Sequence, residues 1–498
     1  NWSGEYWAEM AEGQCFQWKY LTPSYMGKDK YGNDKRFFYS QPIKFSARYV
    51  RITSQQIGLK MNEVIFHDTN GDRIPATVIA QLNAMEESTL YSDANNIFDE
   101  QDTLEGLPSW WNSTYFDEIY HARTAYEHLH GTVPYETSHP PLGKVIMSIG
   151  IAIFGMVPFG WRVMGALAGI LMLPAMYLLG KQLTKKSSFA FAAALMLALD
   201  CQHFTQTRIA TIDSYPVLFI LFSWLFMLRF MQRDIVRLPV KKLLPDLALS
   251  GLFMGLGIAS KWIGVYSGAG LAVAFFWTIF RHMRMAATSA HLLKTDKTLS
   301  AEDRKILTLR DQTTMKRVLV ICLWCLLFFV AIPLAIYLLA YIPYFAYAHF
   351  DNLKDYLTAV WNAQLSMFSY HSKPGLGMDH PFYSPWYEWI FNQRPMYYAS
   401  PTYVNTPGWS YAIWCFGNPT IWSAALVGFA YTVFMWAKRH RYTLRKDGET
   451  LHWTATDWDV TMPFLLLSAL SQLLPWVLVP RGTYIYHYFA TTPFLMLS

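Results

Sequence analysis

Charged residues are scarce in this chain, making up 15% of its 498 residues, whereas a soluble domain normally has about a quarter. Hydrophobic residues reach 53%. The lack of charge is concentrated after residue 145, where apolar runs of membrane-spanning length recur. A purely soluble protein is therefore excluded. We predict a polytopic α-helical membrane protein with a soluble N-terminal part, and we attribute the formal charge of +6 to cytoplasmic loops rather than to a nucleic-acid surface.

Cysteine is rare as well, and its spacing indicates neither a metal site nor a disulfide framework. Most of the five cysteines lie in apolar runs: Cys15, Cys201, Cys322, Cys325 and Cys415. His139 and His371 are not in ligand spacing with other donors, so we expect no metal. Because the chain starts without Met and stops inside an apolar run, we expect a fragment that lacks part of the membrane domain at both ends.

The orientation of the spans follows from the basic residues, since Lys and Arg gather in cytoplasmic loops. Segments 229–242, 281–317 and 438–446 carry five, nine and five of them, whereas the long segment 345–418 carries three. The first three segments are therefore predicted to be cytoplasmic and the fourth to lie outside. The candidate spans are 161–180, 188–204, 213–231, 245–260, 262–280, 318–344, 419–437, 458–478 and a truncated one from about 484.

Residues 142–155 are apolar but short for a span, and we interpret them as a juxtamembrane helix. If they crossed the bilayer, the preceding segment would be cytoplasmic and could not share a face with 345–418. With this interpretation the outer face gathers the segment before residue 160, the 205–212 turn, the long aromatic loop and residues 480–488. Their convergence is the main argument for a site on that face.

The N-terminal part alternates apolar and polar residues in short runs such as 47–52 and 61–66, which predicts strands. We expect an all-β sandwich over residues 1–95 on the outer face. About thirty residues of it resemble the closing strands of discoidin-type carbohydrate-binding modules. The resemblance implies a glycan as a partner, although many such modules are only structural spacers.

Residues 115–144 concentrate titratable side chains immediately before the first long apolar run. Such a cluster at the mouth of a membrane domain is costly and usually has a chemical role; the alternative is an ordinary polar loop. Asp117 is the candidate general base. Glu118 is its neighbour, but adjacent side chains on a helix diverge by about 100°. His121, one turn on, either orients Asp117 or is an ordinary surface histidine.

A transferase that works outside the membrane must draw on a lipid-linked donor, because nucleotide sugars and ATP are absent there. It needs a carboxylate base, cations for the leaving phosphate and an apolar groove for the lipid. The candidate cations are Arg208, near Asp213, together with Lys261 and Arg481. The alternatives are a structural Arg208–Asp213 pair and an interfacial anchor at Lys261.

The segment 361–414 is dense in Trp and Tyr, which stack on sugars but also gather at membrane interfaces. The candidate acceptor or sugar ligands are His121, His139, His371, Trp386 and Arg394.

Six motifs occur in order over residues 97–498: Phe-Asp-Glu-Ile-Tyr-His, His-Pro-Pro-Leu-Gly-Lys, Arg-Ile-Ala-Thr-Ile-Asp, Ser-Lys-Trp, Ser-Pro-Trp-Tyr-Glu-Trp and Tyr-His-Tyr. Together they resemble the bacterial branch of the protein O-mannosyltransferases, which use dolichyl- or polyprenyl-phosphate mannose. The resemblance implies a C-type glycosyltransferase fold and inverting transfer to Ser or Thr hydroxyls of proteins, with no cofactor beyond the lipid-linked donor. It places the family's acidic pair on Asp117 and Glu118, its outer-loop arginine on Arg162, and its Arg-x-x-x-x-Asp element on Arg208 and Asp213.

The expected parts are a module over 1–95, a first outer loop over 96–160, a membrane core over 161–344, an aromatic outer loop over 345–418 and C-terminal spans over 419–498. Two features depart from eukaryotic members of the family. Their acidic residue lies close before His-Pro-Pro, whereas this chain has Glu136-Thr-Ser before that motif. Their long outer loop holds a β-trefoil domain, for which the aromatic loop of this chain is too short. The tripeptide Phe98-Asp99-Glu100 repeats the acidic motif without its continuation, and we rank it below Asp117.

Two other functions stay open at this point. The first alternative is a related enzyme that moves a lipid-linked sugar to a lipid or glycan. The second is a non-catalytic protein that binds glycans or transports a solute. No internal repeat typical of transporters is recognised in the sequence, and the polar clusters lie on the predicted outer face. The sequence therefore favours a multi-pass enzyme of the cell membrane with an extracytoplasmic site.

Overall fold

The computed structural model describes residues 4–9, 16–21, 49–54, 64, 66–67, 72–79, 94–98, 114–399, 412–438, 443–447, 450–454 and 457–498. The chain divides into two compact units. Unit 1 comprises Asn1–Tyr115 and Ser400–Tyr411, and unit 2 comprises Phe116–Ala399 and Ala412–Ser498.

Unit 1 contains β-strands, as the alternating sequence predicts. The strands β1 (Gly4–Glu9), β2 (Phe16–Leu21) and β3 (Tyr49–Ser54) form an antiparallel sheet in the order β2-β1-β3, and β4 (Phe66–His67) pairs with β5 (Arg73–Ile74). A 3₁₀ turn, η1, covers Ala94–Ile97. The run 47–52 thus lies largely in β3. Most of the expected sandwich, including most of the run 61–66, lies outside the described residues, so the discoidin-like module stays a prediction. Asp99 and Glu100 of the repeated tripeptide also lie outside them.

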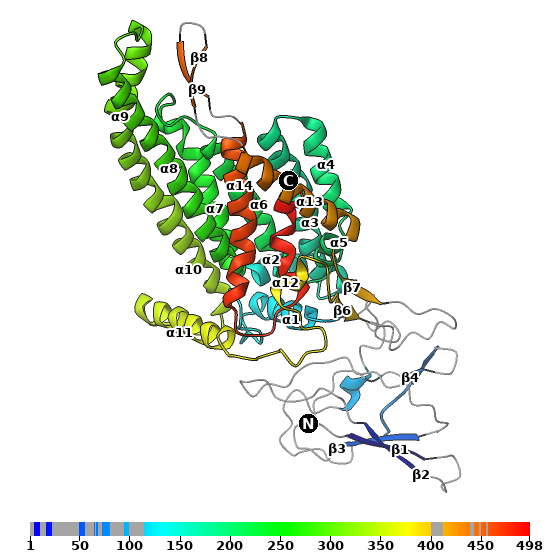
Figure 1. Ribbon diagram of the computed structural model, residues 1–498. Helices are drawn as coiled ribbons and strands as arrows, with labels where there is room; N and C mark the ends of the chain where they lie inside the picture. Colours follow the sequence, from blue (N-terminus) through cyan, green and yellow to red (C-terminus); the bar gives the residue numbers. More distant parts are fainter. Residues whose placement is uncertain are drawn as a thin grey trace. The chain divides into compact units, whose positions relative to one another are not determined.

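Unit 2 is a helical bundle (Figure 1). Its helices are α1 (Glu118–Leu129), α2 (Leu142–Phe154), α3 (Pro158–Thr184), α4 (Ser187–Ala198), α5 (Cys201–Arg208), α6 (Ser214–Met231), α7 (Leu244–Ser260), α8 (Ile263–Thr295), α9 (Ala301–Leu326), α10 (Ile332–Tyr344), α11 (Leu353–His371), α12 (Trp386–Trp389), α13 (Pro419–Lys438), α14 (Asp457–Leu473) and α15 (Thr492–Leu495). Shorter elements are η3 (Val240–Lys242), the π-helical turn η4 (Leu327–Ala331), η5 (Leu474–Leu478), η6 (Ile485–Ala490) and the hairpins of β6 (Met396–Ala399) with β7 (Ile413–Cys415) and of β8 (Thr443–Asp447) with β9 (Thr450–Thr454).

Six helical segments among the described residues are long and apolar enough to cross a membrane. They are Pro158–Thr184, Ser214–Met231, Ile263–Thr295, Ala301–Tyr344, Pro419–Lys438 and Val460–Leu478. These segments correspond to six of the predicted spans, and α7, with 17 residues, corresponds to a seventh. Residues 142–155 form the separate short helix α2, which ends at Gly155 with φ of 83°.

The predicted span over 188–204 is wrong in its extent, because α4 ends at Ala198 and α5 begins at Cys201. Asp200 lies between the two helices and caps α5 by accepting a hydrogen bond from the backbone N of His203 at 3.2 Å. Its carboxylate also accepts hydrogen bonds from the backbone N of Asn418 and from Trp422 Nε1, each at 2.9 Å. These distant partners explain why an apolar run breaks at an acidic residue.

The two ends of the bundle differ in composition. Figure 1 shows α1, α11 and α12 at one end, and the start of α9 with the β8–β9 hairpin at the opposite end. The basic segment 281–317, which includes the start of α9, therefore lies at the end opposite α1. This arrangement is consistent with the predicted separation of the basic loops from the acidic motif.

Candidate active site

Asp117 lies directly before α1, at the end of the bundle where α11 and α12 also lie (Figure 1). The preceding Phe116 adopts a left-handed backbone conformation with φ of 52°, which is rare for a bulky residue and is often found at functional sites. The Asp117 backbone carbonyl accepts the first helical bonds, from the N–H groups of Tyr120 and His121. Its side chain does not cap the helix. Within the described part of the chain, no hydrogen bond to this carboxylate is found.

The environment of Asp117 raises the pKa of its carboxyl towards neutral pH. The pKa of its carboxyl is raised to about 7, mainly by burial; Lys261 acts to lower it, and Asp213 and Glu136 add to the rise. Lys261 Nζ lies 2.7 Å from Asp213 Oδ1, and both side chains are buried. A carboxylate with a pKa near the working pH is efficient at both accepting and releasing a proton.

Glu118 has a different environment from its neighbour. Arg162 Nε and Nη2 each donate to the Glu118 carboxylate at 2.7 Å, and the backbone N of Ala210 donates to it at 2.9 Å. Glu118 is fully buried. The ion pair joins the start of α1 to α3, and the hydrogen bond from Ala210 joins it to the segment before α6. Glu118 and Arg162 are thus partners of one another.

Three of the candidate histidines form a row that starts on α1. The ring centroids of His121 and His139 are 6.3 Å apart, and those of His139 and His371 are 5.1 Å apart. His371 Nε2 donates to the backbone carbonyl of Ser138 at 2.7 Å. Burial lowers the pKa of His121 and of His371 to about 4 and the pKa of His139 well below its usual range. The three rings are therefore neutral at neutral pH.

The sequence analysis assigned no role to Glu136 and Lys144, yet they form a buried ion pair next to this row. Lys144 Nζ also donates to the backbone carbonyls of Glu136 at 2.9 Å and His139 at 3.3 Å. Burial acts to raise the pKa of Glu136, but Lys144, His139 and His121 together outweigh it and hold that pKa well below its usual range. The pair fixes the His-Pro-Pro segment, and the signal for it was the proximity of Glu136 to the His-Pro-Pro-Leu-Gly-Lys motif.

Arg481 lies on a tightly packed loop at the same end of the bundle. The backbone N of Gly482 donates to the Leu376 carbonyl at 2.7 Å, and a Cβ added to Gly482 would lie 2.3 Å from the carbonyl oxygen of Gly377. The guanidinium lies 6.0 Å from the Tyr370 ring centroid. Its charge contributes, after burial, to the lowered pKa of His371. No carboxylate in the described ranges forms an ion pair with Arg481.

Arg208, Arg394 and Trp386 have other neighbours. Arg208 is exposed and lies 4.5 Å from the Phe204 ring centroid, while Asp213 is paired with Lys261 instead. The alternative of an Arg208–Asp213 pair is therefore wrong. Arg394 forms an ion pair with Glu388 at 3.2 Å, and Trp386 packs edge-on against Tyr387.

For Trp386 and Arg394, no contact with the Asp117 group is found among the residues that the structure describes. Within the same residues, no cluster of three or more His, Cys, Asp or Glu side chains could hold a metal ion.

Two family models match consecutive parts of the chain. Residues 152–353 match dolichyl-phosphate-mannose-protein mannosyltransferase, and residues 356–498 match the C-terminal four-transmembrane region of protein-O-mannosyltransferase. The chain belongs to the protein O-mannosyltransferase family. The resemblance inferred from the six motifs is thereby confirmed. Membership of this family, together with the apolar helices, also confirms a multi-pass membrane protein.

Curated members of the O-mannosyltransferase family are similar to this chain over most of its length. It is 24% identical over 439 residues to the polyprenol-phosphate-mannose–protein mannosyltransferase of Mycolicibacterium smegmatis (strain MKD8), covering 79% of this chain and 77% of the relative. It is 25% identical over 399 residues to the protein of the same name from Corynebacterium glutamicum, covering 72% and 69%.

The solved structure of the S. cerevisiae protein O-mannosyltransferase Pmt1-Pmt2 complex, bound to the sugar donor, superposes with a TM-score of 0.58. The sequences are 12% identical, and the match covers 78% of this chain and 81% of the yeast chain. This similarity concerns the fold and confirms the predicted C-type glycosyltransferase architecture of unit 2.

Proposed function

We propose that this chain transfers mannose from polyprenyl-phosphate mannose to Ser or Thr hydroxyls of proteins. Its family and the names of its curated relatives support the donor and the acceptor class. The observation that carries the proposal is the half-buried Asp117 carboxylate beside the Lys261–Asp213 pair, where burial raises its pKa to about 7. Among the described residues, no hydrogen bond to this carboxylate is found.

In the proposed reaction Asp117 acts as general base. The acceptor hydroxyl oxygen attacks C1 of mannose while Asp117 takes the hydroxyl proton. The bond from C1 to the phosphate oxygen breaks, and the lipid phosphate leaves with the bonding electron pair. Because attack and departure occur on opposite faces of C1, the configuration inverts. A positioned base of this kind contributes about 10²–10⁴ in rate.

Arg481 and Lys261 are the proposed ligands of the leaving phosphate. Lys261 is already balanced by Asp213 at 2.7 Å, whereas Arg481 forms no ion pair with a carboxylate among the described residues. A guanidinium of this kind is suited to a developing phosphate charge, to which it can donate two hydrogen bonds. Exposed Arg208 is proposed to contact donor head groups at the rim.

Glu118 and Arg162 are proposed to position the site rather than to react. Their bidentate pair is saturated with hydrogen bonds, and it holds the first turn of α1, which carries Asp117. The neutral His121, His139 and His371 are proposed to hydrogen-bond the acceptor or the sugar. Trp386 and Arg394 stay proposals for more distant acceptor contacts.

The proposed location is the extracytoplasmic face of the cell membrane. The basic segment 281–317 lies at the end of the bundle opposite α1 (Figure 1), and such segments face the cytoplasm. This arrangement supports an extracytoplasmic position for Asp117, where a lipid-linked donor takes the place of nucleotide sugars.

The test is transfer by the detergent-purified full-length protein from synthetic polyprenyl-phosphate mannose to a Ser/Thr-rich peptide. The expected product is a mannosylated peptide with an α linkage if the donor is β-linked, analysed by mass spectrometry and NMR. Polyprenyl-phosphate glucose and a glycan acceptor serve as controls. Transfer only to the glycan would contradict the proposed acceptor, and a retained linkage would contradict the direct displacement.

A further inference from the structure

The helix α11 has an apolar face that the described part of the chain leaves uncovered. Five large hydrophobic residues on this face are between 40% and 70% exposed: Leu353, Leu357, Trp361, Leu365 and Phe368. They are spaced by four, four, four and three residues, which aligns them along one side of a helix. A continuous apolar stripe of this kind marks an interaction surface.

A second face of α11 packs on α10 and orients the stripe. Val360 and Met367 are buried against Tyr341 and Tyr344. Gln364 Nε2 donates to Tyr341 Oη at 2.9 Å. The rotation of α11 about its axis is therefore fixed by contacts within unit 2.

The third face of α11 is polar. Its exposed members are Asp355, Thr358, Asn362, Ser366 and Ser369. At about 100° per residue, this polar face is centred roughly a third of a turn from the apolar stripe and from the packed face. The helix thus has one packed side, one exposed apolar side and one exposed polar side.

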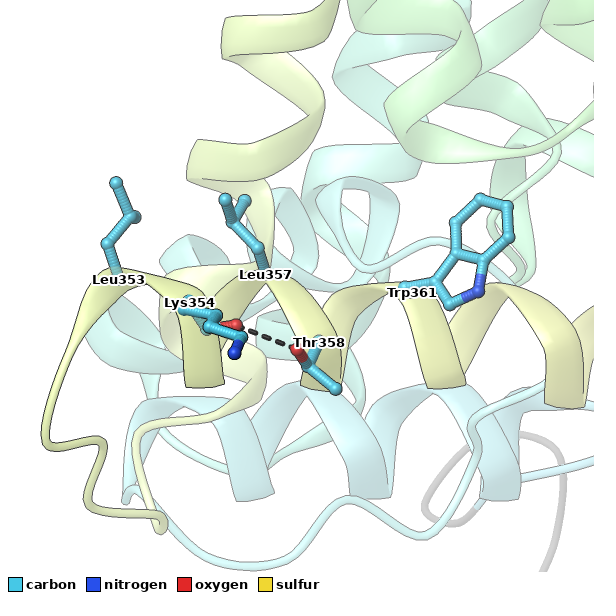
Figure 2. A pocket seen from close by; sticks show the side chains of 5 residues that line it. All are labelled: Leu353, Lys354, Leu357, Thr358 and Trp361. Carbon is cyan, nitrogen blue, oxygen red and sulfur yellow. Dashed lines mark hydrogen bonds between the residues drawn. The ribbon is translucent and has the colours of Figure 1, made fainter.

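The direction of the stripe indicates which surroundings its apolar side chains face. Figure 1 shows α11 lying across the end of the bundle, at the point where α10 finishes. Figure 2 shows Leu353, Leu357 and Trp361 pointing to the same side of α11, and these residues line a shallow groove with Lys354 and Thr358. The last turns of α10 also expose apolar side chains, Leu339 and Ile342. Both the stripe and the last turns of α10, which belongs to a candidate membrane span, therefore expose apolar side chains at this end of the bundle.

We propose that α11 lies in the interface of the leaflet at the Asp117 end of the bundle, with its apolar stripe among the acyl chains and its polar face in water. The charges of Lys354 and Asp355 balance, so the attraction comes from apolar burial rather than from anionic lipids. Trp361 has the amphipathic ring that favours this depth. Because α11 ends at His371, whose Nε2 donates to the Ser138 carbonyl, the bilayer supports one wall of the candidate site.

The test is photocrosslinking in the full-length chain, reconstituted in nanodiscs of phosphatidylcholine with or without phosphatidylglycerol. Benzoylphenylalanine replaces Trp361 or, in a second variant, Leu365, and the matched control replaces the neighbouring Asn362. Lipid adducts are measured by mass spectrometry. We expect adducts at positions 361 and 365 to exceed those at 362 by about tenfold in both lipid mixtures.

Three results would overturn the proposal. Equal lipid labelling at 361, 365 and 362 would mean that the stripe does not face the bilayer. Crosslinks from 361 to a second copy of the chain would assign the stripe to a protein interface. Adducts that require phosphatidylglycerol would replace apolar insertion by an electrostatic contact. None of these results depends on the transferase activity, so the proposal can fail while the proposed function stands.

Discussion

At the end of the bundle opposite the candidate site, the buried Asp246 and Arg310 each have partners of opposite charge. The carboxylate of Asp246 lies 3.1 Å from Arg229 Nε and 2.6 Å from Arg233 Nε, and Arg310 Nη2 lies 2.6 Å from the carboxylate of Asp234. At the site end, Glu118, Glu136 and Asp213 are paired in the same way. Asp117, in contrast, forms no ion pair with any described residue.

The difference separates charges that hold the fold from a charge that is available for reaction. Breaking a buried pair leaves an uncompensated charge and costs stability. An unpaired buried carboxylate has a raised pKa, and such groups are concentrated at functional sites. The two ends therefore predict different consequences for substitutions that are chemically alike.

The largest effect is expected for Asp117→Asn. The amide keeps the shape of the carboxylate but accepts no proton, so the rate of mannose transfer should fall by at least about a hundredfold. Burial of the charged form opposes folding, so thermal stability should be unchanged or higher. The control is Asp355→Asn, the same substitution on the exposed polar face of α11. Equal rates in the two variants would remove the distinction between Asp117 and other carboxylates.

A smaller loss is expected for Arg481→Gln, which removes the cation that is proposed to bind the donor phosphate. The KM for polyprenyl-phosphate mannose should rise by about ten- to a hundredfold. Arg481→Lys should retain part of the affinity because it keeps the charge. The control, Lys373→Gln, removes an exposed charge from the same loop region. An unchanged KM in Arg481→Gln would assign the phosphate to another cation.

The pH dependence of transfer should follow the carboxyl of Asp117. Only the deprotonated form accepts the proton, and burial raises its pKa to about 7. The rate should therefore be constant above neutral pH and fall about tenfold per pH unit below it. Donor binding, measured in parallel, separates catalysis from affinity. A profile that bends near pH 4 would mean that Asp117 has an ordinary pKa or that another group is the base.

The smallest direct effect on chemistry is expected for Glu118→Gln, although it should reduce stability. It removes the carboxylate from an ion pair whose side chains are 0% (Glu118) and 16% (Arg162) exposed, and breaking such a pair costs up to about 3–5 kcal/mol. The double variant Glu118→Gln/Arg162→Met should recover much of that stability, as measured by thermal unfolding in detergent. If the single variant unfolds at the wild-type temperature, the pair does not hold α1 on α3.

Much of the architecture could be predicted because its signals are local. Hydropathy identified most of the spans, the apolar run 142–155 predicted the short helix α2, and the sequence placed Asp117 and Glu118 side by side at a helix start. Their divergence also follows from helical geometry. These inferences need only a few neighbouring residues, so one sequence is enough.

The ion pairs could not be predicted because they join residues far apart in the chain. Lys261 lies 48 residues from Asp213, and Arg162 lies 44 residues from Glu118. Asp200 interrupts an apolar run because Asn418 and Trp422 donate hydrogen bonds to it. The sequence shows which side chains can pair, but only the packing of α1, α3 and α7 determines which pairs form.

Single-turnover transfer by Asp117→Asn and Glu118→Gln, each corrected for the folded fraction, tests the central claim most directly. The two variants change adjacent carboxylates in the same way. We predict that Asp117→Asn loses at least about a hundredfold in rate, whereas folded Glu118→Gln retains a rate close to that of the wild type. The opposite result, with transfer retained in Asp117→Asn and lost in folded Glu118→Gln, would contradict the assignment of Asp117 as the base.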